Sequence, residues 1–124
     1  MVVGLVLGSD DPDPNEAASA IRATLAAAAG SLEVARIEYR EAVSDGGVER
    51  RTEYEGSLDA LDSSRSNYRT VRPALETLVP SLVQEVDDLY QRCTSLMEAP
   101  SDVTDVSACL VRLGELLKGT AERP

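Results

Sequence analysis

Small and apolar residues recur every three or four positions along most of this 124-residue chain. From Ala18 to Ala42 the steps alternate between three and four, which is the seven-residue repeat of a helix packed along another helix. A second stretch, from Tyr54 to Arg72, continues the same repeat. Because a half-buried strand needs a period of two, this pattern predicts helices.

The two repeats are separated by Asp45-Gly46-Gly47, a sequence typical of a turn. If the chain reverses there, residues at equal distance from the turn face each other, and Tyr39 then meets Tyr54 while Leu32 meets Leu61. This agreement predicts an antiparallel helical hairpin over residues 14–72.

Two further helical patterns follow, over 73–98 and 101–119, with a turn at Pro100 between them. They predict a second hairpin over 73–119, whose last helix is capped by Ser101 or Thr104. Pro73 and Pro80 each remove a backbone hydrogen bond, so we expect a break before Pro73 and a compact bundle. The alternative is a bent rod in which the second and third helices continue into one another.

The predicted fold is therefore all-α, with antiparallel hairpins forming a four-helix bundle or an elongated coiled-coil-like bundle over 14–119. Residues 1–13 form an arm and linker, and residues 120–124 form a disordered tail. The apolar stretch 1–7 reads as a short extended arm. A single strand cannot make a sheet, so we expect it to be disordered, to lie across the helices or to pair with another copy.

Two motifs near the start of the chain contain residue types that occur in binding sites. The segment Val3-Gly4-Leu5-Val6-Leu7-Gly8-Ser9-Asp10 resembles the first strand and phosphate loop of the aminoimidazole ribonucleotide carboxylase/mutase family, which implies a parallel sheet. The remainder of the chain shows no strands that would build one. Asp11, Asp13 and Asn15 match three ligand positions of a calcium loop, but Glu16 stands where that loop needs glycine, so an N-cap and linker is the better interpretation.

Charge limits the partners of the chain. Its 22 acidic and 12 basic residues give a net charge of −10 and an isoelectric point near 4.4. Such a surface repels phosphate backbones and anionic lipids, so we expect no nucleic-acid or membrane binding. Lys118 is the only lysine, and the excess of carboxylates suggests a halophilic source or, alternatively, a GC-rich actinobacterial one. The expected location is the cytoplasm.

The chain contains no histidine, which removes the commonest general base and the usual zinc ligand. We therefore predict no catalytic, cofactor-binding or metal site, and no enzyme. Cys93 and Cys109 are the only thiols. They are expected to be buried and reduced, about one helical turn apart. A register shift of three residues would place them opposite each other as a disulfide pair.

The remaining hypothesis is a non-catalytic interaction or oligomerisation module, which forms a homo-oligomer or binds a helical partner. The alternative is an acidic regulator, or nucleic-acid mimic, that occupies a basic protein surface. The candidate interaction surface consists of apolar residues beside the predicted seams: Val34, Ile37, Leu78, Val83, Tyr90 and Met97.

Overall fold

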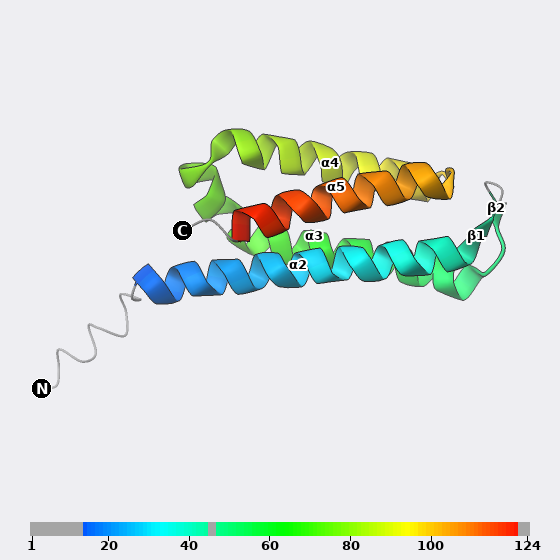
Figure 1. Ribbon diagram of the computed structural model, residues 1–124, viewed down its shortest axis with the longest axis horizontal. Helices are drawn as coiled ribbons and strands as arrows, with labels where there is room; N and C mark the ends of the chain where they lie inside the picture. Colours follow the sequence, from blue (N-terminus) through cyan, green and yellow to red (C-terminus); the bar gives the residue numbers. More distant parts are fainter. Residues whose placement is uncertain (1–13, 45–46, 122–124) are drawn as a thin grey trace, which may run out of the picture.

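The computed structural model describes residues 14–44 and 47–121 of the chain (Figure 1). Four helices and one small strand pair follow one another in this order: α2 (Pro14–Ala42), β1 (Val43–Ser44), β2 (Gly47–Val48), α3 (Arg51–Leu78), α4 (Pro80–Glu98) and α5 (Val103–Ala121).

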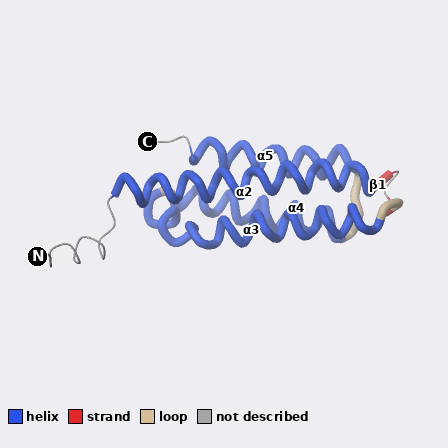
Figure 2. Tube along the Cα trace, turned by 90° about the horizontal axis from the view of Figure 1, so that it is seen from below, coloured by secondary structure: helices blue, strands red, loops and turns tan. Residues whose placement is uncertain are grey.

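The predicted all-α four-helix bundle is confirmed. The long helices α2 and α3 form one antiparallel pair, and the shorter helices α4 and α5 form a second pair that lies along the first (Figures 1 and 2). Helix α2 packs against both α3 and α5, and α4 packs against α3 and α5. The contact between α2 and α5 rules out the bent rod, in which the two hairpins would lie end to end.

The first hairpin closes through a short strand pair that the sequence analysis did not predict. Val43 pairs with Val48, and Ser44 pairs with Gly47. Helix α2 therefore ends at Ala42, whose carbonyl oxygen accepts hydrogen bonds from the backbone N–H groups of Glu49 and Arg50 at 2.7 and 3.1 Å. These bonds satisfy a carbonyl that the end of a helix leaves without an intrahelical partner.

The predicted break before Pro73 is wrong, so the hairpin boundaries 14–72 and 73–119 shift as well. Helix α3 continues through Pro73 to Leu78, and the chain breaks at Val79. Pro73 and Arg69 both lie on the exposed side of α3, where water can solvate the carbonyl that loses its bond. Pro80 instead begins α4, a position in which the missing N–H costs nothing.

The N-terminus of helix α5 is capped by a residue that was not predicted. The Asp102 carboxylate accepts a hydrogen bond from the backbone N–H of Thr104 at 2.8 Å, so neither Ser101 nor Thr104 is the side-chain cap. Helix α5 runs two residues beyond the predicted end at Gly119. The predicted arm, the phosphate-loop resemblance, Asp11 and Asp13, and residues 122–124 lie outside the described residues.

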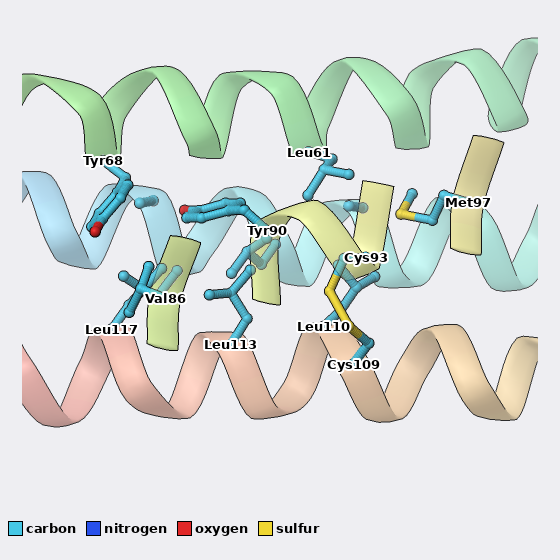
Figure 3. Close-up of a cluster of buried hydrophobic side chains, with 14 of the residues drawn as sticks. Leu61, Tyr68, Val86, Tyr90, Cys93, Met97, Cys109, Leu110, Leu113 and Leu117 are labelled. Atoms are coloured by element: carbon cyan, nitrogen blue, oxygen red, sulfur yellow. A yellow bond between two sulfur atoms is a disulfide. The ribbon is translucent and has the colours of Figure 1, made fainter. Parts of the chain in front are cut away.

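The core is a layered arrangement of aliphatic side chains and tyrosines between the two hairpins. Figure 3 shows Leu61 and Tyr68 pointing from α3 toward side chains of α4 and α5, with Leu113 and Leu117 reaching in from α5. Helix α2 contributes many small residues, which allow close approach of its neighbours. Its buried residues are Leu25, Ala28, Ala29, Leu32, Ala35, Tyr39 and Ala42.

Replacing Leu113, whose side chain is fully buried, should test this core. Leu113→Ala removes buried methyl groups and leaves a cavity, so we expect the free energy of unfolding to fall by about 2–5 kcal/mol. Val111→Ala lies on the same helix at a side chain that is 45 % exposed, and it should change stability by less than about 0.5 kcal/mol. Urea unfolding followed by circular dichroism measures both, and equal losses would contradict the packing described.

Candidate functional site

The six residues of the predicted interaction surface do not form one surface. Val34 is 49 % exposed and Leu78 is 70 % exposed, while Ile37 is half-buried. Antiparallel pairing of the hairpin places Leu78 near the level of the start of α2. With a rise of 1.5 Å per residue, Val34 and Leu78 therefore lie roughly 30 Å apart along the bundle.

Val83, Tyr90 and Met97 are buried, so their assignment to an exposed surface is wrong. Their side chains are at most 2 % exposed. Helix α4 packs between α3 and α5, and a helix with two neighbours buries the middle of a wide apolar stripe. Leu82, Leu89 and Leu96 lie at the edge of this stripe, where they are half-buried.

Cys93 on α4 and Cys109 on α5 form a disulfide, with their Cα atoms 5.8 Å apart (Figure 3). The expectation of reduced thiols is therefore wrong. The packing of α4 against α5 places the two residues opposite each other rather than one turn apart. Cys93 is fully buried and Cys109 is 7 % exposed, so the bond is largely protected from solvent. Disulfides of this kind persist in oxidising compartments.

Two tyrosines of the long hairpin, formed by α2 and α3, bind the backbone of the short hairpin, formed by α4 and α5. The Tyr39 hydroxyl donates to the carbonyl oxygen of Ser101 at 2.6 Å and accepts from the Ser101 N–H at 2.9 Å. The Tyr54 hydroxyl donates to the carbonyl oxygen of Met97 at 2.7 Å. The two rings lie 6.3 Å apart, which confirms that Tyr39 faces Tyr54 across the first hairpin.

A third buried tyrosine, Tyr90, forms a polar layer inside the core together with Ser64. The Tyr90 hydroxyl lies 2.7 Å from Ser64 Oγ, and Ser64 Oγ also donates to the carbonyl oxygen of Ala28 at 2.7 Å. Ser64 of α3 therefore faces Ala28 of α2. Burial raises the pKa of Tyr90 to about 12, although its hydrogen bond with Ser64 acts in the opposite direction.

Most carboxylates on the described surface have no basic partner. Those within 4.0 Å of an arginine are Glu33, Glu55, Glu76, Glu85 and Asp87. The pairs Glu33 with Arg36 and Arg51 with Glu55 each join residues one turn apart on the same helix. Exposed pairs are worth little, and the remaining acids leave a strongly negative surface.

Within residues 14–44 and 47–121, no three side chains of the types His, Cys, Asp and Glu converge on a point that could hold a metal ion. The carboxylates are spread along the helices rather than gathered. None of the helices in this part of the chain is long and apolar enough to cross a membrane.

Residues 14–122 match the family described as the iron permease-associated 4-helix bundle domain. The chain belongs to this family. No curated protein and no solved structure matches.

Membership of the iron permease-associated four-helix-bundle family corrects the functional prediction. The cytoplasmic, halophilic interaction module, and its alternative of an acidic regulator of a basic surface, are wrong, because the family is named for its association with iron permeases. The matched range covers all four helices, so the whole bundle is the family domain.

The disulfide should be present when this iron permease-associated domain is isolated from its own cells. If thiols are trapped with an alkylating reagent before lysis, Cys93 and Cys109 should remain unmodified even after unfolding. Reduction should lower the free energy of unfolding by about 3 kcal/mol, since the bond closes a loop with a sequence separation of 16. Intact mass measures the first outcome and urea unfolding the second. Full alkylation in vivo would contradict the assignment.

Alkaline pH should destabilise the domain through its buried tyrosines. An unfolded tyrosine has a pKa near 10, whereas Tyr90 in the folded state titrates at about 12. Its contribution is fully present below pH 10 and is lost as the pH rises from 10 through 12, by about 1.4 kcal/mol per pH unit at most. In Tyr90→Phe the fall in unfolding free energy over this range should be shallower by that amount. Burial also raises the pKa of Tyr39 and of Tyr68, so part of the slope should remain.

Proposed function

We propose that this domain is a non-catalytic accessory part of an iron permease system, working on the side of the membrane where disulfides persist. The observation that carries the proposal is the family match over residues 14–122. The partner we propose is the permease itself, a helical protein against which a four-helix bundle can pack.

The disulfide supports the proposed location. Cytosolic reductants keep most intracellular thiols reduced, so a buried cross-link between two helices is typical of proteins outside that compartment. A bundle of this size with a thinly filled aliphatic core also gains stability from such a bond. Both points favour a domain exposed to an oxidising medium.

The surface supports a role in gathering iron cations. A net charge of −10 and many unpaired carboxylates create a negative potential, which raises the local concentration of cations and speeds their encounter with a nearby entrance. Because the described residues offer no converging set of ligands, we propose diffuse attraction rather than a resident iron site. Iron is thus the cargo of the system.

An uptake measurement tests the proposal. Cells that depend on the permease and lack this domain should take up radioactive iron more slowly when iron is scarce, by up to about tenfold, and normally when iron is abundant. The variant Glu41→Gln/Asp59→Asn/Asp62→Asn removes three exposed, unpaired charges and should show a smaller defect that disappears in high salt. The charge-neutral variant Ser63→Asn/Ser66→Asn is its matched control.

Two outcomes would contradict the proposal. Uptake that is independent of the domain at every iron concentration would remove the link to iron transport. A defect that is equal in the charge-removing and charge-neutral variants would remove the role of the carboxylates.

A further inference from the structure

A basic hollow lies between α3 and α4 of this acidic protein. Arg65, Tyr68, Arg69 and Arg72 occur at helical spacings of three and four residues, so they share one face of α3. Together with Asp87, Tyr90 and Gln91 of α4 they line a hollow of about 220 Å³. Three arginines and one acidic residue thus line this hollow.

The single carboxylate is already neutralised. Arg72 binds Asp87 through two nitrogens, with Nη2 2.6 Å and Nε 3.1 Å from Oδ2, and it also lies 3.5 Å from Glu76. This arrangement fixes the Arg72 guanidinium and holds the pKa of Asp87 below its usual range. Asp87 therefore remains ionised and paired with Arg72.

Arg65 and Arg69 are not engaged in the same way. In the part of the chain that the structure describes, no carboxylate lies within 4.0 Å of either guanidinium. Arg65 is half-buried on the wall of the hollow, and Arg69 is exposed at its edge. Their charges are available to a ligand, and the half-buried one is less screened by solvent.

The hollow also contains a buried donor that lacks a partner. The Tyr68 side chain is only 2 % exposed, yet its hydroxyl is the one buried side-chain polar atom without a hydrogen bond among the described residues. The neighbouring ring of Tyr90 lies 5.4 Å away (Figure 3). The Tyr90 hydroxyl is bound to Ser64. The Asp87 carboxylate lies near the Tyr68 hydroxyl, and burial together with this negative charge raises the pKa of Tyr68. Burying such a group without a hydrogen bond costs free energy, so the Tyr68 hydroxyl is a donor that an acceptor bound in the hollow would satisfy.

We propose that the hollow between α3 and α4 binds a small oxyanion, either a carboxylate or a phosphate. Arg65 and Arg69 supply the positive charge, the Tyr68 hydroxyl donates a hydrogen bond, and the paired Arg72 forms the fixed wall. The planar fork of arginine matches the oxygens of carboxylates and phosphates. The volume suits a small molecule and is too small for a segment of folded protein. This inference is independent of the proposed role in iron uptake.

Titration with inorganic phosphate and with citrate tests the site. Calorimetry or NMR at constant ionic strength, with sodium chloride as the balancing salt, should show saturable binding of at least one probe. Arg65→Gln and Arg69→Gln should each weaken binding by about tenfold, as expected for loss of a charge-assisted hydrogen bond. Arg40→Gln removes the same charge from an exposed position of α2 and should leave the affinity unchanged.

Tyr68→Phe separates a binding role from a structural one. Because the hydroxyl has no partner in the fold, its removal should leave the urea midpoint unchanged or raised, while weakening the anion several-fold. Tighter binding of citrate would assign the site to polycarboxylates, and tighter binding of phosphate to phosphates. No saturable binding of either probe below about 10 mM would overturn the proposal. Equal weakening by Arg40→Gln would overturn it as well.

Discussion

The short hairpin is held against the long one by tyrosine hydroxyls that bind across the interface. The chain has no Phe and no Trp, so tyrosine is its only large aromatic side chain, and each buried hydroxyl needs a partner. Tyr39 binds the backbone of Ser101, and Tyr54 binds the backbone of Met97. Aliphatic packing alone would allow the two hairpins to slide, whereas these directional bonds fix their relative position.

Much of the fold could be predicted from sequence because the seven-residue repeat and the paired glycines act locally. The facing of Tyr39 and Tyr54 followed from counting outward from the turn. The break predicted at Pro73 does not occur. The free-energy cost of a proline inside a helix depends on whether the carbonyl that loses its hydrogen bond faces water. The strand pair at Val43 and Val48 was missed because two residues are too few to show a period.

The functional features depended on tertiary geometry and were predicted less well. The candidate disulfide was visible as a pair of cysteines, but its formation depended on a register that spacing alone leaves open. The arginines of the basic hollow stand at helical spacing in the sequence, which is a usable signal. That Tyr68 is buried beside them without a partner could not be known, because it depends on where α4 lies. Composition and charge did not indicate membership of the iron permease-associated family.

The stabilising bonds are unevenly distributed along the bundle. The strand pair and the α4–α5 turn lie at the same end of the bundle (Figure 1). The Tyr39 and Tyr54 hydroxyls bind Ser101 and Met97 at that end. The other end holds the junction at Val79, where Leu78 stands open to solvent and the helix restarts at Pro80. Regions with fewer buried contacts open at lower free energy. The end of the bundle at the α3–α4 junction should therefore unfold locally at a lower free energy than the end that holds the strand pair.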